Sequence, residues 1–120
     1  MPAYTLSAGR LRHRVTIQQK VEVQDTFGEM NVEWQDFASN VPAEIAPLSA
    51  REFIAAKAVQ ATVSTKITIR YRTGILANMR VVHVAKGGET TIYNIAKPIR
   101  DNKTGLGWLT LLATDGVNDG

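Results

Sequence analysis

The chain has 120 residues, of which 44% are hydrophobic and 21% charged, and it contains no cysteine. This length suits one domain built around a single core. No apolar run approaches the roughly 18 residues that a membrane-spanning helix needs. The missing cysteines exclude disulfides, thiol catalysis and cysteine-ligated zinc. The first residues lack the basic and apolar regions of a secretory signal, so we expect a soluble protein made in the cytoplasm.

The net charge of +3 hides an uneven distribution along the chain. Residues 1–20 carry four basic and no acidic residues, whereas residues 21–50 carry six acidic and no basic ones. Residues 51–103 are again basic, with ten basic against three acidic residues. Blocks of opposite charge suit a subunit that binds identical neighbours head to tail. The alternative is that solvated strand faces of opposite charge fold back beside each other within one subunit.

The first expected strand covers residues 11–23, where odd positions are mostly apolar and even positions are polar. A straight strand of this length would span about 45 Å, more than a small barrel can use. We therefore predict a bulge at Gln19, the polar residue that interrupts the apolar series. Asp25 and Gly28 then predict a turn, because Asp bonds forward to the backbone and Gly accepts positive φ.

The second expected strand places Met30, Val32 and Trp34 on one face. The apolar positions then change phase and continue at odd positions from Val41 towards Pro47. A change of phase turns side chains to the opposite face of a sheet, so we predict a bulge or short loop at residues 36–40.

Residues 48–60 are the one expected helix. Ser49 is a good N-cap, Glu52 completes a capping box, and Leu48 can pack onto Phe53. The rest of the segment has few large apolar residues, so it predicts either a short helix or a mobile loop inserted between two strands.

Further strands are expected at residues 61–72, 79–84, 91–96 and 106–113, separated by glycine-containing turns. The sequence thus predicts a mainly β protein, a small antiparallel β-barrel of about six strands, formed by residues 10–114 between flexible ends at residues 1–9 and 115–120. Trp34, Ile69 and Trp108 are expected to be largely buried, and Trp108→Ala to cost roughly 3–5 kcal/mol.

No pattern in the sequence predicts catalysis, so we expect no enzyme, no metal site and no cofactor. His13 and His83 lie within strand patterns and are interpreted as packed or hydrogen-bonded strand residues. Two distant histidines and scattered carboxylates do not make a zinc site. The Gly87-Gly88 pair lacks the following helix of a phosphate-binding loop.

A nucleic-acid-binding barrel is an alternative. Basic residues occupy two strand faces, and two aromatic side chains could stack bases; these residues are Arg10, Arg12, Arg14, Lys66, Arg70, Arg72, Tyr71 and Trp108. However, Tyr71 has the parity of the core residues. The modest net charge also argues against sequence-specific binding. Non-specific contact with DNA is compatible with the pattern, because Lys and Arg neutralise phosphates without reading bases.

Three blocks of sequence, in the same order, resemble a known family. They are residues 10–18 (RLRHRVTIQ), 47–53 (PLSAREF) and 66–81 (KITIRYRTGILANMRV), and residues 108–112 (WLTLL) fit the last strand of that family. The chain resembles the head-closure proteins, also called head-tail joining or stopper proteins, of long-tailed bacteriophages. Residues 85–90 (AKGGET) depart from the pattern, so the hairpin there can differ in length.

The resemblance implies a structural protein of the virion, at the head-tail junction, that closes the portal channel after DNA packaging and offers a docking surface for the tail. Implied partners are copies of itself in a ring of six or twelve, portal and adaptor proteins above, tail terminator or tail proteins below, and packaged DNA. Another connector subunit, such as a tail terminator, is an alternative. A helical adaptor is disfavoured because little helix is expected.

Two sets of candidate site residues follow. The subunit or partner interface is expected to use charged residues of both signs, which are Glu29, Glu33, Asp36, Arg12, Arg14, Arg70 and Arg72. A channel-gating segment is expected within the helix insertion, at Ser49, Arg51, Glu52, Phe53 and Lys57. The alternative for this segment is a helix that only caps one end of the barrel.

Overall fold

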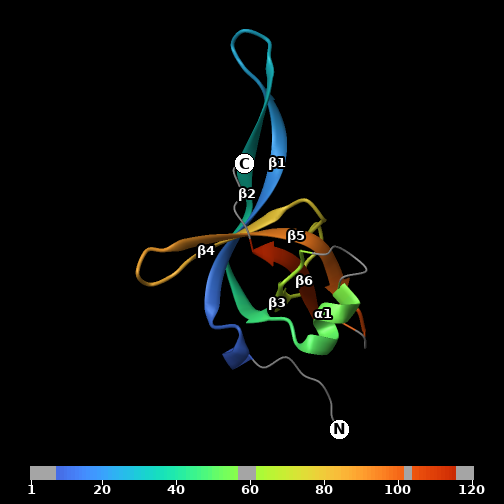
Figure 1. Cartoon of the computed structure of the whole chain (residues 1–120). Helices are drawn as coiled ribbons and strands as arrows, with labels where there is room; N and C mark the ends of the chain where they lie inside the picture. The colour runs from blue at the N-terminus through green and yellow to red at the C-terminus, as the bar shows by residue number, and fades with distance from the viewer. Residues whose placement is uncertain (1–7, 57–61, 102–103, 116–120) are drawn as a thin grey trace.

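The computed structural model describes residues 8–56, 62–101 and 104–115 (Figure 1). Within these ranges a 3-10 turn at Ala8–Arg10 precedes six strands and one α-helix. The elements are β1 (His13–Gln24), β2 (Met30–Pro47), α1 (Ala50–Ala56), β3 (Thr65–Arg70), β4 (Arg80–Val84), β5 (Thr90–Arg100) and β6 (Trp108–Asp115). The predicted flexible ends lie mostly outside the described residues.

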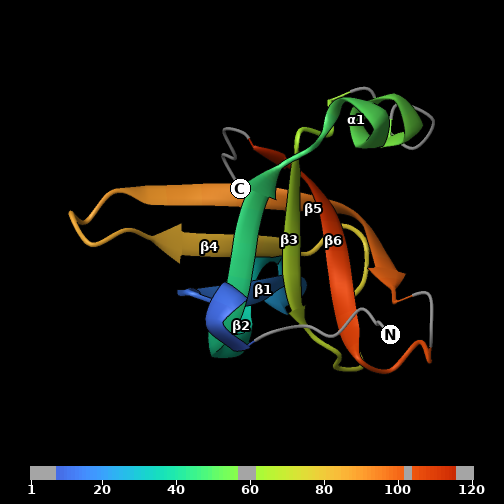
Figure 2. The same cartoon turned by 90° about the horizontal axis from the view of Figure 1, so that it is seen from below.

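The six strands form a closed antiparallel barrel in the order β1-β2-β3-β6-β5-β4, closed by pairing of β4 with β1 (Figures 1 and 2). Closure removes free sheet edges within the barrel. The predicted mainly β fold with one short helix is therefore confirmed. The expected hairpin at residues 79–96 is also present, as β4 and β5 joined by a turn in which Gly88 has a φ of 93°.

The barrel interior is filled by alternate residues of all six strands, as the period-two pattern predicts. The buried cluster comprises Val15, Ile17, Val41, Ala43, Ile67, Ile69, Ile75, Met79, Val81, Ile95, Leu109, Leu111 and Ala113. Tyr71 packs against this cluster, as its parity predicts. Apart from Met79, these buried side chains are aliphatic, so they fill the barrel interior as an apolar core.

β1 and β2 continue beyond the barrel as a two-stranded hairpin, here called the arm (residues 19–35). β1 pairs with β4 only from Val15 to Gln18, and β2 pairs with β3 only from Ala43 to Pro47. Over Gln19–Gln24 the described residues pair β1 with β2 alone. Figure 1 shows the arm projecting from the barrel, and it accounts for the elongated outline of 60 × 32 × 29 Å.

The predicted bulge at Gln19 is wrong, because pairing from Gln18 to Gln24 is continuous. A long strand can leave a barrel instead of bending around it, and β1 does so. The bulges lie on β2, where the register shifts twice between Val41 and Asp36, so the prediction for residues 36–40 is confirmed. Asn40 has a φ of 56°, a left-handed conformation that Asn tolerates and a bulge can use.

The prediction of two largely buried tryptophans is also wrong. Ile69 is fully buried as expected, but Trp34 and Trp108 are only partly buried. Trp108 is paired with Arg70 and shares its outward-facing parity, while Leu109, one residue on, faces the core. Trp34 lies at the base of the arm, where no barrel interior surrounds it. The expected cost of Trp108→Ala is accordingly smaller than for a core residue.

The helix begins as predicted. Ser49 Oγ accepts a hydrogen bond from the Glu52 backbone N–H at 3.2 Å, and Glu52 Oε1 accepts one from the Ser49 N–H at 2.9 Å. This reciprocal pair is a capping box. The helix is described only to Ala56; the rest of the predicted segment, including Lys57, lies outside the described residues.

Candidate partner-binding surfaces

The tip of the arm is a hydrogen-bonded turn that presents an aromatic side chain to solvent. Asp25 Oδ1 accepts hydrogen bonds from the backbone N–H groups of Phe27 and Glu29, both at 2.9 Å. These bonds, chiefly the one from Glu29, hold the pKa of Asp25 below its ordinary value. Gly28 adopts a φ of 87°, which closes the turn. Phe27 is consequently held with 92% of its surface exposed.

Apolar side chains also line both faces of the arm. Met30 and Val32 are 58% and 51% exposed and share a face with Trp34. Val21 and Val23 lie on the opposite face. An isolated two-stranded hairpin is at best marginally stable in water. An apolar arm of this kind is therefore a candidate for contact with another chain.

The base of the arm is braced against the barrel. Arg80 on β4 donates a hydrogen bond from Nε to Gln18 Oε1 at 2.7 Å, and Gln18 Nε2 donates one to Asp36 Oδ1 at 2.9 Å. The Arg80 guanidinium also lies 4.2 Å from the centroid of the Trp34 ring, with Lys20 Nζ 5.2 Å from it. Cation–π contacts of this kind stabilise the ring's position. The arm thus projects from a structured base.

Acidic residues are concentrated on the arm. It carries Glu22, Asp25, Glu29 and Glu33, with Lys20 as its single basic residue. Elsewhere, charges of opposite sign do meet within the subunit: Arg10 Nη2 lies 2.8 Å from Glu44, and Lys66 Nζ lies 2.6 Å from Glu52. The alternative, opposite charges that meet within one subunit, is therefore present at these two places, and charge contacts between copies stay a prediction.

A basic cleft lies where the start of β1 meets the end of β4. Its lining includes Arg12, His13, Arg14, His83 and Lys86, and no acidic side chain. The rings of His13 and His83 are 4.8 Å apart in an edge-to-face arrangement at 74°, so the fold brings together two histidines that are 70 positions apart in the sequence. Burial lowers the pKa of His83, and the adjacent His13 lowers it further.

The seven predicted interface residues do not form one cluster in the subunit. Glu29 and Glu33 are exposed on the arm, and Asp36 is bonded to Gln18 at its base. Arg12 and Arg14 line the basic cleft. Arg70 and Arg72 are exposed near the end of β3. Acidic and basic groups are thus separated across the molecule, as contacts between copies would require.

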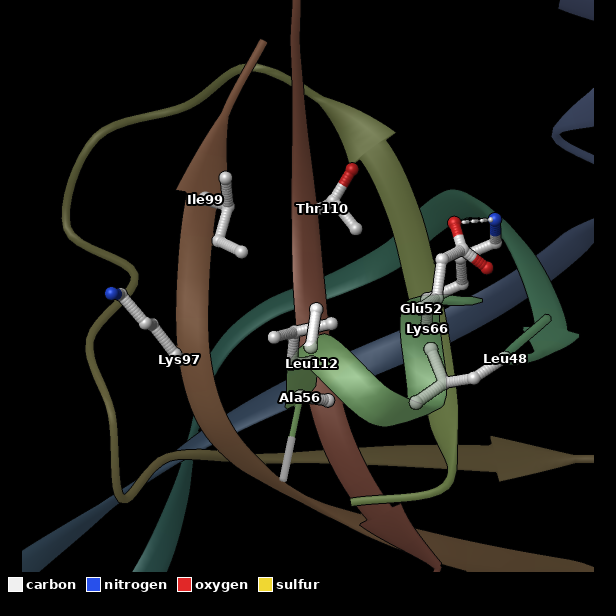
Figure 3. Close-up of a pocket in the computed structure, with 9 residues that line it drawn as sticks. Leu48, Glu52, Ala56, Lys66, Lys97, Ile99, Thr110 and Leu112 are labelled. Carbon is white, nitrogen blue, oxygen red and sulfur yellow. Dashed lines mark hydrogen bonds and ion pairs between the residues drawn. The ribbon is translucent and has the colours of Figure 1, made fainter. Parts of the chain in front are cut away.

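A third surface is the groove between α1 and the barrel, here called the helix groove (Figure 3). Most of its lining is aliphatic, and the side chains are Leu48, Glu52, Ala55, Ala56, Lys66, Lys97, Ile99, Thr110 and Leu112. The ion pair of Glu52 with Lys66 lies on one side of the groove and Lys97 on the other (Figure 3). That pair, together with the Ser49 N–H, holds the pKa of Glu52 below its ordinary value.

Four of the five candidate gating residues lie in the described part of the insertion that contains α1. Ser49 and Glu52 build the helix start, while Arg51 and Phe53 are exposed or partly so on its surface. Among the described residues, no group of three His, Asp or Glu could hold a metal ion. No helix in the described ranges is long and apolar enough to cross a membrane.

Comparison with known proteins decides the family. The family model described as "Phage head completion protein" matches residues 6–116. The chain belongs to the phage head completion protein family. The resemblance found in the sequence is thereby confirmed, and with it a structural role in joining phage head and tail.

One solved structure is similar to this chain in sequence and fold. The solution structure of protein SF1141 from Shigella flexneri 2a is 30% identical in sequence, covers 95% of this chain and 100% of its own, and superposes with a TM-score of 0.75. No curated protein matches the chain. A head completion protein works in contact with other proteins of the phage particle, so the surfaces described above are candidates for those contacts.

The sequence alone missed two features of this head completion protein. The first is the exposure of Phe27. The sequence shows an aromatic residue inside a polar turn, but it does not show whether that side chain is exposed or buried. Ile99 and Leu112 line the helix groove, and only the pairing of β5 with β6 brings them together beneath α1.

Proposed function

We propose that this head completion protein forms a ring at the head-tail junction, closes the portal channel after DNA packaging and offers the tail its docking surface. The observation that carries the proposal is the separation of an acidic, apolar-tipped arm from a barrel with basic surfaces in one subunit. Surfaces of opposite charge at different places on one molecule favour head-to-tail contacts between copies, which close into a ring when the rotation allows.

The test of ring formation is reversal of charge on the acidic side. The triple variant Glu29→Lys, Glu33→Lys and Asp36→Lys should weaken assembly on the portal-adaptor complex at low salt, because like charges would then meet across the contact. Electron microscopy of the mixture measures assembly, and circular dichroism checks the fold. Asp36 also accepts a hydrogen bond from Gln18 at the base of the arm. The double variant Glu29→Lys with Glu33→Lys keeps this bond, so it separates an effect on the contact between copies from an effect on the base of the arm.

Glu89→Lys, in the exposed turn between β4 and β5, is the matched control. It should leave assembly unchanged. Native circular dichroism together with undiminished assembly of the triple variant at low salt would contradict the charge argument.

The same proposal includes non-specific contact with packaged DNA through basic side chains. The basic cleft supports it, because Arg12, Arg14 and Lys86 line it without an acidic neighbour in the lining. Replacing Arg12 and Lys86 by Ala should lower the salt dependence of binding to random-sequence duplex DNA by about one phosphate contact per residue. An unchanged slope would remove this part of the proposal.

The gate of the channel is proposed to be the insertion that contains α1. The insertion joins β2 to β3, and Figure 2 shows α1 at one end of the barrel. Phe53 and Ile54 are exposed on it, so copies from neighbouring subunits could meet in a channel. Deleting residues 50–60 and bridging with glycines should give rings that assemble but leak DNA from filled capsids. Intact rings that retain all the packaged DNA would exclude the gate. A misfolded monomer would favour the alternative, in which the helix only caps one end of the barrel.

A further inference from the structure

Phe27 has the properties of a preformed anchor for a protein contact. The Asp25 hydrogen bonds fix the backbone of the turn around it, so little backbone freedom remains to be lost on binding. A buried aromatic ring contributes 150–250 Å² of contact area and often dominates an interface. Its neighbour Glu29 is exposed and has no hydrogen-bonding or ionic partner for its carboxylate among the described residues. The tip therefore offers an aromatic ring beside a free negative charge.

The helix groove has the complementary properties. Its volume is about 320 Å³, and five of its nine lining side chains are aliphatic: Leu48, Ala55, Ala56, Ile99 and Leu112. Lys97, at its rim, is exposed and has no ion-pair partner within the described ranges. Figure 3 shows Ile99 and Leu112 on neighbouring strands, Leu112 next to the helix, and Lys97 on the same strand as Ile99. An aromatic ring flanked by a carboxylate matches both the apolar lining and the rim charge.

The arm of the same subunit does not fill this groove. Figure 1 shows the arm and α1 on different sides of the barrel, with the arm pointing away from the helix. The arm extends about 20 Å past the barrel, since six residues of strand rise about 3.4 Å each. This reach is sufficient to place the tip on an adjacent subunit, whose two shorter dimensions are 32 and 29 Å.

We propose that the arm of one copy inserts Phe27 into the helix groove of the next copy, with Glu29 facing Lys97. The contact is heterologous, because each copy gives its arm to one neighbour and receives an arm from the other, and such contacts generate rings. This inference rests on the proposed ring and names the residues that join its subunits. The contact between subunits would also involve α1, because the inserted phenyl group of Phe27 packs against the side of that helix that faces the barrel.

The basic cleft is less suited to this anchor than the helix groove. The basic cleft is lined mainly by charged and imidazole groups, which would leave an aromatic ring poorly packed. A cleft at the end of β3 contains Arg72, Leu76 and Arg100. It has two cations and an apolar lining, so it is the serious competitor. The control variant for cross-linking is therefore placed in this cleft.

The decisive experiment is disulfide trapping, since the chain has no cysteine of its own to create background. The double variant Phe27→Cys with Ile99→Cys is oxidised at high protein concentration and run on non-reducing gels. A heterologous contact should give a ladder of dimers, trimers and longer linked species, because every copy is bonded on both sides. Disulfides require Cβ atoms about 3.5–4.5 Å apart, so random contact gives little product.

The matched control pairs Phe27→Cys with Leu76→Cys, which moves the second thiol to the competing cleft. A ladder with Ile99→Cys but not with Leu76→Cys supports the helix groove. A ladder only with Leu76→Cys, or no ladder beyond dimers with Ile99→Cys, overturns the proposal. Each single-cysteine variant gives at most dimers and sets the background.

Charge exchange provides an independent readout. Glu29→Lys and Lys97→Glu should each weaken self-association measured by sedimentation about tenfold, while the two changes together should restore part of it. Additive losses would overturn the pairing of these two residues. Electron microscopy of the oxidised double variant on the portal-adaptor complex tests the arm contact and the proposed function separately. Rings that form without cross-links would reject the arm contact alone. If neither the variants nor the parent chain form rings, the proposed function is rejected.

Discussion

β1 and β2 pass through two environments, and the comparison shows how differently the same strand pair is used. Inside the barrel, Val41 of β2 is 3% exposed and packs in the core; nine residues earlier on the same strand, Val32 is 51% exposed on the arm. The hydrogen-bond ladder between β1 and β2 runs through both regions. Burial, not strand formation, therefore separates the stabilising half of this hairpin from the half that is available for binding.

The largest expected difference comes from the same substitution made in the two regions. Val41→Ala should lower the free energy of unfolding by about 2–3 kcal/mol, because two buried methyl groups are lost and a cavity remains. Val32→Ala should change it by about 0.5 kcal/mol or less. Urea denaturation of both variants measures the two values. Equal losses would mean that the arm is part of the cooperative core.

A smaller loss is expected at Asp101, which stabilises the turn before β6. Its buried carboxylate accepts hydrogen bonds from backbone N–H groups, which are those of Thr104, Gly105, Gly107 and Trp108. Asp101→Ala should cost about 1–3 kcal/mol, because these donors lose their partner. Denaturant unfolding measures the loss. Asp25→Ala, which removes the equivalent acceptor from the exposed turn of the arm, is the control and should cost less.

The histidine pair should make the free energy of unfolding of the barrel depend on pH. This effect is expected to be smaller than the losses at Val41 and Asp101. Because burial lowers the pKa of His83 in the folded protein, the unfolded chain binds the proton more readily. Stability is then full above the ordinary histidine pKa of 6.5 and falls as the pH drops through that value towards the folded pKa. His83→Gln should reduce this fall between about pH 8 and pH 5. An identical pH profile for the variant would assign the effect to other groups.

The smallest effect on stability is expected at the arm's tip. Phe27→Ser should leave the free energy of unfolding within about 0.5 kcal/mol of the parent, because the ring is almost fully exposed. The same variant should weaken self-association, which sedimentation measures. Loss of stability without loss of self-association would reverse the roles assigned to tip and barrel.

The comparison also explains which predictions from the sequence hold. Alternation at residues 61–72 correctly predicts that Ile67 and Ile69 face the core, because the barrel has one buried face and a one-residue slip would expose both. The same alternation in the arm predicts a strand but not its burial. Trp34 illustrates the failure: its pattern is that of a core residue, yet it lies past the last barrel pairing and contacts the cations of Lys20 and Arg80.

The capping box and the bulge region of β2 are local features, so the sequence is sufficient to predict them. The candidate surfaces are not local. The helix groove requires residues from α1, β3, β5 and β6, and the basic cleft requires His13 beside His83. No spacing in the sequence brings these residues together.

The sequence by itself determined a mainly β chain of one small barrel, the start of its helix, its blocks of charge and its resemblance to phage head-closure proteins. These properties depend on period-two patterning, turn residues and composition, which act over a few positions. Only the tertiary structure decided that β1 and β2 leave the barrel as an arm, that Phe27 is exposed at its tip, and that a groove opens beneath α1. Those outcomes depend on where pairing with β3 and β4 ends, and this is set by closure of the whole barrel.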